Sequence, residues 1–157
     1  SKGVVNGYED NTYRPEDSVT KGEYIKLLMS VTSSGESTNF TQYRDVNASW
    51  AKGYVSRAIE LGLCDNINSA ETEFGVDEPI TRAQAAALMG RLLKPEISDA
   101  ALSFADTATI PDWAQEPVLA TVQLGLIAGN DDGTFRPMNN LTRAEAATII
   151  ERILNLE

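Results

Sequence analysis

Apolar residues recur at helical spacing in three stretches of the chain, each starting a few residues after a threonine. Thr20, Thr81 and Thr142 are spaced 61 residues apart, so the three stretches share one register. One face of an α-helix returns about every 3.6 residues, and the pattern therefore predicts an amphipathic helix after each threonine. The apolar positions are Tyr24, Leu27, Leu28 and Val31; Ala85, Leu88, Met89, Leu92 and Leu93; and Ala146, Ile149, Ile150, Ile153 and Leu154.

A second, shorter helix is predicted before the last two of these helices, over about 54–61 and 117–124. Each shorter helix is followed by a glycine, Gly62 or Gly125, which suits the left-handed position that closes many helices. Pro117 fits best at the first helical position, where its missing N–H costs no hydrogen bond. The pattern therefore predicts units of two helices joined by a turn-rich loop.

Three segments of the chain also align with one another, namely 4–23, 63–84 and 126–145. The first and third match without a gap, whereas the middle copy is two residues longer. Single supersecondary units cannot bury their apolar faces alone, so we expect the copies to pack together as one all-α domain. The predicted repeats are 1–40, 41–98 and 99–157, of which the first lacks its shorter helix.

The composition narrows the functions that are open to the chain. With 13 Lys and Arg against 23 Asp and Glu, the net charge of −10 disfavours binding to nucleic acid or to anionic lipid. No apolar run approaches the roughly 18 residues of a membrane span and no signal peptide is recognisable, so no membrane insertion is expected. The chain has no histidine and one cysteine, Cys64, which is expected to fill core space. His-dependent catalysis and His-ligated metals are thereby excluded, and we expect no catalytic residue, metal site or cofactor.

Each long helix begins with a threonine that is followed three residues later by Glu or Gln. This spacing is that of a capping box, in which the two side chains satisfy backbone N–H groups at the helix start. The residue after each threonine is a cation, Lys21, Arg82 or Arg143, at a position where the helix dipole opposes positive charge. The cation therefore has another role. It either helps the helix start to bind a carboxylate or phosphate, or forms an ion pair with a nearby acid.

Other repeated polar and aromatic residues have a structural and a functional interpretation. Trp50 and Trp113 are expected in a short turn before the shorter helices, where they cover a helix end or stack against a sugar ring. Asp45 and Asp106 are turn or cap residues, or they hydrogen-bond sugar hydroxyls. Arg14 and Arg136 precede prolines and are interpreted as partners of loop carboxylates.

In combination, these motifs resemble the S-layer homology (SLH) repeat, which usually occurs in threes. The resemblance is carried by aromatic-x-Asp, Trp-Ala and Leu-Gly elements and, most completely, by GNDDGTFRPMNNLTRAE at 129–145. It implies an all-α, pseudo-threefold, three-pronged domain that anchors proteins to the bacterial cell wall or S-layer, outside the cell. It also implies binding of secondary cell-wall polysaccharide, commonly through pyruvylated N-acetylmannosamine, with peptidoglycan as a further possible partner. The loop glycines Gly7 and Gly129 join the cations, aspartates and tryptophans as candidate carbohydrate-binding residues.

The chain departs from the pattern of this family at several positions. The first copy has Lys21 and Gly22 in place of Arg and Ala, and the middle copy has Gln84 in place of Glu. The histidine that usually precedes the tryptophan is replaced by Ser49 and Asp112. The first copy also lacks the Asp/Trp element altogether.

Chain order predicts that each cation faces the Asp/Trp element of the following repeat, so that grooves form between neighbouring repeats. Arg143 would pair with the element that the first copy lacks, and the uncovered apolar surface there is expected to cause self-association or a loosened first lobe. The second groove is expected to be the strongest site. The two complete sets are Lys21, Asp45 and Trp50, and Arg82, Asp106 and Trp113.

Two further functions remain open beside a non-catalytic carbohydrate-binding anchor. The first is a protein–protein assembly module of the bacterial cell surface, in which the grooves receive another polypeptide. The second is a glycan-processing enzyme with paired carboxylates, although no carboxylate pair stands out from ordinary turn chemistry.

Overall fold

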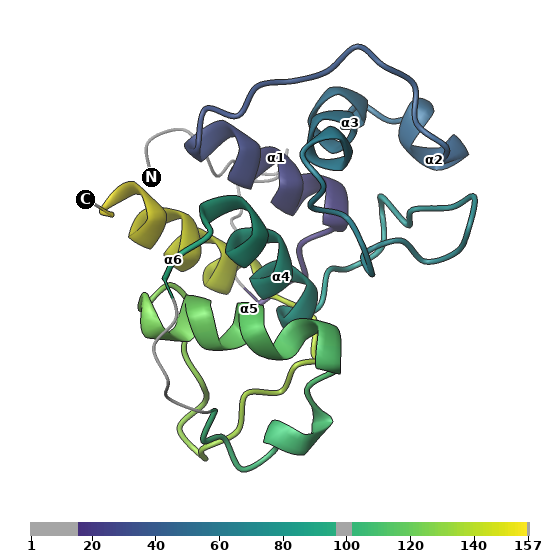
Figure 1. Ribbon diagram of the computed structural model, residues 1–157. Coiled ribbons are helices and arrows are strands. Elements are labelled where there is room, and N and C mark those ends of the chain that lie inside the picture. Colours follow the sequence, from purple (N-terminus) through teal and green to yellow (C-terminus); the bar gives the residue numbers. More distant parts are fainter. Residues whose placement is uncertain (1–15, 97–101, 157) are drawn as a thin grey trace.

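The computed structural model describes residues 16–96 and 102–156, and within these ranges the chain forms helices and no β-strand (Figure 1). The predicted all-α class is therefore confirmed. None of the described helices is long and apolar enough to cross a membrane. The elements are α1 (Lys21–Val31), α2 (Arg44–Asn47), α3 (Lys52–Glu60), α4 (Arg82–Leu93), the 3₁₀ helix η1 (Thr107–Thr109), α5 (Asp112–Gln123) and α6 (Arg143–Leu154).

The long helices α1, α4 and α6 are those that the apolar periodicity predicts, and each begins at a complete capping box. In α6, the Thr142 hydroxyl accepts the Glu145 N–H at 3.1 Å, and the Glu145 carboxylate accepts the Thr142 N–H at 3.1 Å. The same reciprocal pair forms at the starts of α1 and α4. Such a box satisfies two of the N–H groups that a helix start leaves without a partner.

A ring of backbone hydrogen bonds joins the three segments that precede the long helices. The N–H of Val19 donates to the carbonyl of Leu141 at 3.0 Å, Leu141 donates to Ile80 at 2.8 Å, and Ile80 donates to Val19 at 3.0 Å. All three residues are buried, so water cannot replace a lost partner. The repeats therefore meet at their helix starts and share one hydrophobic core, in which Cys64 is buried as predicted. Burial raises the pKa of the Cys64 thiol to about 12.

The shorter helices start earlier than predicted. Helix α5 begins at Asp112, so Trp113 lies inside the helix and not in a preceding turn, and Pro117 lies in the helix interior. The prediction placed Pro117 first because an interior proline removes a hydrogen bond to the carbonyl four residues earlier. Packing compensates for that loss, because Pro117 lies directly against Gly90 of α4. Trp50 does lie in a turn, as predicted.

The ends of the shorter helices follow the prediction. Gly62 and Gly125 adopt positive φ angles of 78° and 74°, a region that costs a glycine little. The N–H groups of Leu63 and Leu126, one residue later, reach back to the helix carbonyls of Ala58 and Thr121. This arrangement is the Schellman motif, which satisfies carbonyls that a helix end would otherwise leave open.

Each of the first two long helices is covered by the shorter helix of the following repeat: α3 packs against α1, and α5 packs against α4. The second contact is especially close. A Cβ atom at Gly90 would lie 3.0 Å from the Cβ of Pro117 and 3.1 Å from its Cα. Glycine at this position therefore lets the two helices approach each other.

Replacing Gly90 by alanine is expected to lower the free energy of unfolding by about 1–2 kcal/mol. The added methyl group pushes α5 away from α4, an overpacking cost that outweighs the roughly 1 kcal/mol that alanine gains over glycine in a helix. Urea unfolding of both forms measures the difference. Glu151→Ala is the matched control, because Glu151 occupies the equivalent, exposed position of α6 and should tolerate alanine. A Gly90→Ala variant more stable than the parent chain would contradict the close approach.

Candidate ligand-binding site

An aspartate from the preceding segment holds the loop before α4 and the loop before α6. The carboxylate of Asp106 accepts the N–H groups of Phe135 and Arg136, each at 2.8 Å. Asp45 likewise accepts three N–H groups, from Phe74, Gly75 and Val76, at 2.8–2.9 Å. Both aspartates therefore have a structural role, but not as the local turn or cap residues that the sequence predicted, because their oxygens bind the backbone of a loop 29–31 residues further along the chain.

The aromatic residue two positions before each aspartate packs on the same loop. The rings of Phe104 and Phe135 lie 5.3 Å apart between centroids, and those of Tyr43 and Phe74 also lie 5.3 Å apart. The aromatic-x-Asp motif therefore binds the ring and the amide of one phenylalanine at the same time. Partial desolvation opposes ionisation of Asp45 and Asp106, but the backbone N–H donors outweigh it and keep the pKa of both carboxyl groups below the usual value.

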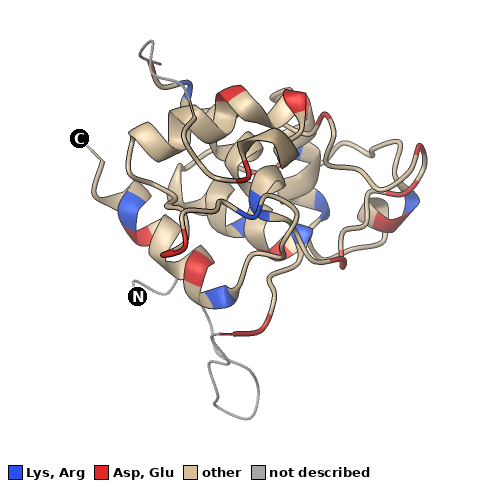
Figure 2. Cartoon of the chain, turned by 90° about the horizontal axis from the view of Figure 1, so that it is seen from below, with Lys and Arg blue, Asp and Glu red and all other residues tan. Residues whose placement is uncertain are grey.

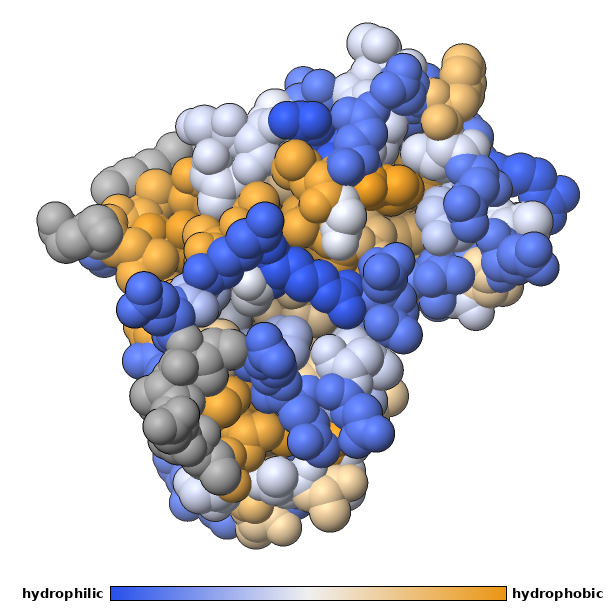
Figure 3. Space-filling view, viewed as in Figure 1, coloured by the Kyte–Doolittle hydropathy of each residue, from blue (hydrophilic) through white to orange (hydrophobic). Residues whose placement is uncertain are grey.

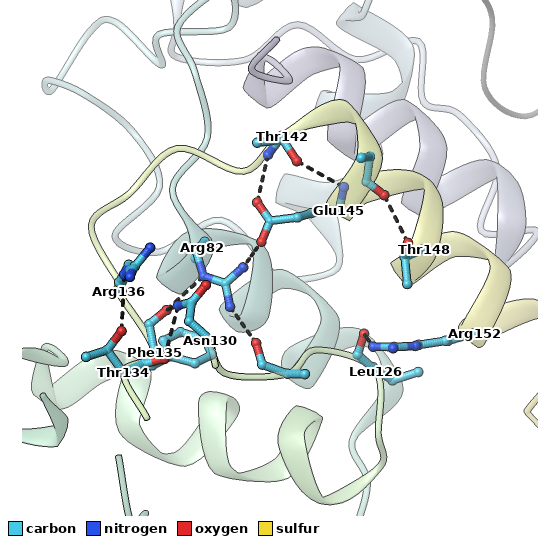
Figure 4. A network of polar contacts seen from close by, with 12 residues as sticks. Arg82, Leu126, Asn130, Thr134, Phe135, Arg136, Thr142, Glu145, Thr148 and Arg152 are labelled. Carbon is cyan, nitrogen blue, oxygen red and sulfur yellow. Dashed lines mark hydrogen bonds and ion pairs between the residues drawn. The ribbon is translucent and has the colours of Figure 1, made fainter. Parts of the chain in front are cut away.

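The cation at the start of α4 reaches across to the loop of the third repeat (Figure 4). The Arg82 guanidinium donates from Nε to the carbonyl of Phe135 at 2.8 Å and from Nη2 to the carbonyl of Ala128 at 2.7 Å. Its Nη1 forms an ion pair with Glu145. Arg82 is only 4% exposed, and this burial lowers its pKa, although Glu145 opposes the shift. The ion-pair interpretation of Arg82 is therefore confirmed, with an acid of the next repeat as the partner.

Lys21 makes the equivalent contacts one repeat earlier. Its Nζ donates to the carbonyl of Phe74 and to the hydroxyl of Ser69, both at 2.9 Å, and lies 3.9 Å from the Glu78 carboxylate. Burial lowers the pKa of Lys21, and the nearby carboxylates of Glu78 and Asp45 act against this shift. Lys21 and Asp45 thus bind the same loop, as Arg82 and Asp106 do.

The backbone N–H groups at the starts of α1 and α4 donate to the neighbouring repeat. Lys21 and Gly22 donate to the carbonyls of Glu78 and Val76 at 2.9 Å. At α4, Arg82 and Ala83 donate to Asn139 and Pro137 at 2.9 Å. The expectation that these helix starts bind an anion through their amides is therefore wrong, because backbone carbonyls already accept those hydrogens.

A pocket of about 260 Å³ opens between Arg82, the loop of the third repeat and one face of α6 (Figure 4). Its walls combine apolar surface with both signs of charge. Figure 4 shows Arg82 and Arg152 approaching this region from opposite sides. The lining residues are Arg82, Leu126, Ile127, Ala128, Gly129, Asn130, Ala144, Glu145, Thr148, Ile149 and Arg152.

The polar residues of the pocket differ in how tightly they are held. Arg82 and Glu145 are fixed by their mutual ion pair, and Glu145 also caps α6. Arg152 is exposed and donates one hydrogen bond of 3.3 Å to the carbonyl of Leu126. Because a guanidinium has five N–H donors, Arg152 can hold this carbonyl and still bind a ligand carboxylate. The exposed Thr148 lies between these groups on α6.

Gly129 is the predicted residue that meets Arg82 in this pocket. A Cβ atom there would lie 2.4 Å from Cε1 of Phe104, so the ring leaves no room for a side chain. The two predicted tryptophans, Trp50 and Trp113, lie outside the pocket. Trp113 is half-buried against the core, and Trp50 is 59% exposed with the Lys26 ammonium 5.6 Å above its ring. Neither tryptophan lines the pocket.

The remaining predicted residues are placed as follows. Arg143 is 8% exposed at the start of α6, and its N–H donates to the carbonyl of Asp17. Arg136 binds the loop carboxylate of Asp132 at 2.6 Å, which confirms its predicted role. Hydrogen bonds from Thr134 and Arg136 lower the pKa of Asp132 to about 2. Gly7 and Arg14 lie outside the described residues.

The sequence interpretation missed the pocket residues that come from α6. Glu145 was assigned only a capping role, whereas it also pairs with Arg82 of the preceding repeat. Arg152 was not singled out, although Arg91 occupies the equivalent position of α4 and donates to the carbonyl of Leu63 in the same way. A repeated arginine at the end of two long helices was therefore the signal that could have found it.

In the view of Figure 2, Lys and Arg are interspersed with Asp and Glu along the described part of the chain. This distribution agrees with the net charge of −10. The positive charges at the pocket are thus local.

Comparison with known proteins identifies the repeats. The S-layer homology domain family matches residues 1–25, 42–86 and 103–147. The chain is 28% identical over 160 residues to an amylopullulanase of Thermoanaerobacterium thermosulfurigenes, covering 98% of this chain and 8% of that protein. It is 28% identical to a cellulosome-anchoring protein of Acetivibrio thermocellus, covering 96% of this chain and 35% of the relative.

A third relative is the surface-layer 125 kDa protein of Lysinibacillus sphaericus, which is 23% identical over 97% of this chain and 13% of its own length. The chain thus spans only a small part, at most about a third, of these relatives. The enzyme among them matches over its S-layer homology portion alone. The three family matches cover most of the 157 residues, and the chain belongs to the S-layer homology family of S-layer and bacterial cell-surface proteins.

Proposed function

We propose that this chain is a non-catalytic module that anchors a protein to the bacterial cell wall by binding secondary cell-wall polysaccharide in the grooves between its repeats. Membership of the S-layer homology family supports attachment to the cell surface. The observation that carries the proposal is the pocket of about 260 Å³ that two repeats build together. The ring of hydrogen bonds between equivalent residues further supports the pseudo-threefold, three-pronged arrangement implied by the family.

The ligand of this pocket is one acidic sugar residue, for which a pyruvylated amino sugar is the best candidate. Ligand pockets for drug-sized molecules are usually about 300–1,000 Å³, so this pocket suits a single ring. Its apolar wall, which includes Leu126 and Ile149, suits the C–H face of a sugar and a pyruvyl methyl group. The exposed guanidinium of Arg152 is placed to hold the pyruvyl carboxylate.

The other grooves are expected to bind more weakly. In the first groove a lysine replaces Arg82, and Gln84 stands at the position equivalent to Glu145. The equivalent of the Arg82–Glu145 ion pair is therefore absent there, and Lys21 instead forms a longer pair of 3.9 Å with Glu78. The predicted third groove would involve Arg143 and residues of the first repeat that lie outside the described ranges. We therefore expect the grooves to differ in their affinity for the polysaccharide.

Filling the pocket is expected to weaken binding strongly without disturbing the fold. Thr148 is exposed on the pocket wall, so Thr148→Trp adds a bulky ring where the sugar would lie. We expect calorimetric titration with a pyruvylated N-acetylmannosamine glycan to show at least about a tenfold weaker affinity. Ser30→Trp, on the exposed surface of α1 and away from the pocket, is the matched control. Equal affinity of both variants would contradict the proposed site.

Recognition of the ligand's carboxylate by Arg152 is tested separately. Removing a charged hydrogen-bond donor costs about 1.5–3 kcal/mol, so Arg152→Gln should weaken binding of the pyruvylated glycan by about tenfold or more. The same glycan without its pyruvyl group should bind both forms equally weakly. Arg91→Gln, at the equivalent position of α4, is the control. If Arg152→Gln affects the two glycans equally, Arg152 does not recognise the carboxylate.

A further inference from the structure

We infer that Asn130 is a specificity-determining residue of the pocket, whose side-chain oxygen accepts a hydrogen bond from an N–H or O–H group of the bound sugar. The inference rests on the proposed function and deepens it, because it assigns the group that recognises the sugar ring in addition to the one that recognises its carboxylate. Asn130 belongs to the loop of the third repeat and lines the pocket together with Arg82 and the residues of α6.

The carboxamide of Asn130 is held in one orientation by its own loop. Its Nδ2 donates to the carbonyl of Thr134 at 3.0 Å and to the carbonyl of Phe135 at 3.4 Å. Carbonyl oxygens only accept hydrogen bonds, so the NH₂ group of the carboxamide faces them and its oxygen cannot. With both N–H groups directed to the loop, the polar atom that remains for a ligand is Oδ1.

The Oδ1 atom of Asn130 is accessible from outside the chain. The hydrogen bonds that the described residues make with this side chain use its N–H groups. Throughout residues 16–96 and 102–156, every buried side-chain nitrogen or oxygen has a hydrogen-bond partner. Oδ1 is therefore not buried, in agreement with the half-buried state of the whole residue. A fixed and accessible acceptor on a pocket wall is the kind of group that orients a ligand.

Asn130 and Arg152 lie on different walls of the pocket. The carbonyl of Phe135 accepts hydrogen bonds from both Asn130 and Arg82, which places the carboxamide beside the Arg82 guanidinium (Figure 4). Arg152 comes from the last turn of α6 and approaches from the opposite side. A sugar ring whose carboxylate binds Arg152 therefore extends towards Asn130. The two residues recognise different ends of one ring.

The chemistry of these two ends predicts which sugars the pocket prefers. A guanidinium only donates hydrogen bonds, whereas the fixed Oδ1 of Asn130 only accepts them. The acylated amino group of an amino sugar offers an N–H to this oxygen, and a neutral sugar offers an O–H. A sugar without either donor would displace water from Oδ1 and leave it without a hydrogen bond. Sites that are built to bind a polar group reject analogues that lack it for this reason.

The repeats differ at the position of Asn130. Leu63 and Leu126 are equivalent, and the residue four positions later is Ile67 in the middle copy and Asn130 in the third. Ile67 is completely buried and has no polar side-chain atom, so the first groove does not offer this acceptor. The equivalent residue of the first copy is Tyr8, which lies outside the described residues. Asn130 therefore gives the second groove a selectivity that the first groove lacks.

Figure 3 shows that apolar and polar surface alternate over the face of the molecule drawn in Figure 1. Apolar surface alone therefore does not single out one place on this face for a sugar. A directed acceptor such as Asn130 adds the selectivity that apolar contact does not supply.

Calorimetric titration with three pyruvylated glycans tests the assignment. At one ring carbon they carry an acetamido group (N-acetylmannosamine), a hydroxyl group (mannose) or only hydrogen (the deoxy analogue). The parent chain should bind a glycan with a donor about fivefold more tightly than the deoxy glycan, which is the effect of about one neutral hydrogen bond. Asn130→Ile, which introduces the residue of the middle repeat, should remove this preference and leave affinity for the deoxy glycan unchanged. The glycan whose affinity falls identifies the donor as an N–H or an O–H.

Two further variants separate recognition of the sugar from stability of the loop. Asn130→Ala removes the same oxygen with a smaller side chain and should also remove the preference, so the test holds if isoleucine does not fit this loop. Asp132→Ala loosens the same loop, because Asp132 accepts hydrogen bonds from Thr134 and pairs with Arg136. Asp132 does not line the pocket. Its replacement should lower the free energy of unfolding and keep the preference for glycans with a donor.

Two results would overturn the inference, and they are distinguishable. If the parent chain binds the glycans without preferring those with a donor, or if Asn130→Ile and Asn130→Ala keep that preference, Asn130 does not recognise the sugar and the proposed function still stands. If the parent chain binds none of the three pyruvylated glycans, the proposed function fails and the inference fails with it.

Discussion

Replacing Arg82 by alanine is expected to lower the free energy of unfolding by about 3–5 kcal/mol, measured by urea denaturation. Removing one partner of a buried ion pair costs about this much, because the other groups keep their desolvation cost without a partner. Arg82 is only 4% exposed and serves the carbonyls of Phe135 and Ala128 as well as Glu145. The loss should loosen the contact between the second and third repeats and also reduce ligand binding.

Two variants control this prediction. Arg82→Lys should recover part of the stability, because Lys21 at the equivalent position already binds the carbonyl of Phe74 and a hydroxyl with one ammonium group. Arg136→Ala removes a more exposed arginine whose ion pair lies within its own loop, and should cost no more than about 1 kcal/mol. An Arg82→Ala variant as stable as Arg136→Ala would show that Arg82 does not join the repeats.

Replacing Asp45 by asparagine is expected to cost about 2–3 kcal/mol at neutral pH. Asp45 accepts three backbone N–H groups, and hydrogen bonds to a charged partner contribute about 1.5–3 kcal/mol. Asparagine is uncharged, and its NH₂ group would face one of these donors. The exposed Asp77 belongs to the same loop, so Asp77→Asn is the control and should have little effect. Equal stability of both variants would contradict the role of Asp45.

The cost of Asp45→Asn should also depend on pH. The pKa of Asp45 lies below its usual value in the folded chain, so between the two values the unfolded chain binds more protons than the folded one. The stability that Asp45 contributes is therefore complete above the ordinary aspartate pKa of about 4 and is lost as the pH falls through the lower, folded value. The difference between parent and variant should shrink as the pH is lowered from about 5 to about 3. A constant difference would contradict this account.

The helices were predictable because their signals are local. Apolar spacing after Thr20, Thr81 and Thr142, together with capping residues, determined the starts of α1, α4 and α6 to the residue. The start of α5 was not predictable, because the interior position of Pro117 depends on a distant glycine, Gly90, that only the folded chain brings beside it. Local preference disfavours that placement, and tertiary packing reverses it.

The candidate site could be predicted only in part, for a related reason. The unfavourable position of Arg82 at a helix start indicated a role for its charge. The repeat order predicted that Arg82 faces Asp106 and Trp113, and Arg82 does bind the loop that Asp106 holds, but neither Asp106 nor Trp113 lines the pocket. The sequence did not reveal that the guanidinium would be buried on carbonyls of the next repeat. It also did not reveal that the open wall of the pocket would come from Thr148 and Arg152 of α6, because these positions are set by how the repeats pack.

Co-sedimentation with purified bacterial cell walls, before and after extraction of their secondary polysaccharide, tests the central claim most directly. The chain should pellet with intact walls and with walls treated with protease, and Thr148→Trp should reduce pelleting while Ser30→Trp leaves it unchanged. After the polysaccharide is extracted, the chain should remain in solution. Equal pelleting with extracted walls would contradict polysaccharide binding and favour peptidoglycan, and loss of pelleting after protease treatment would show that a cell-surface protein is the partner.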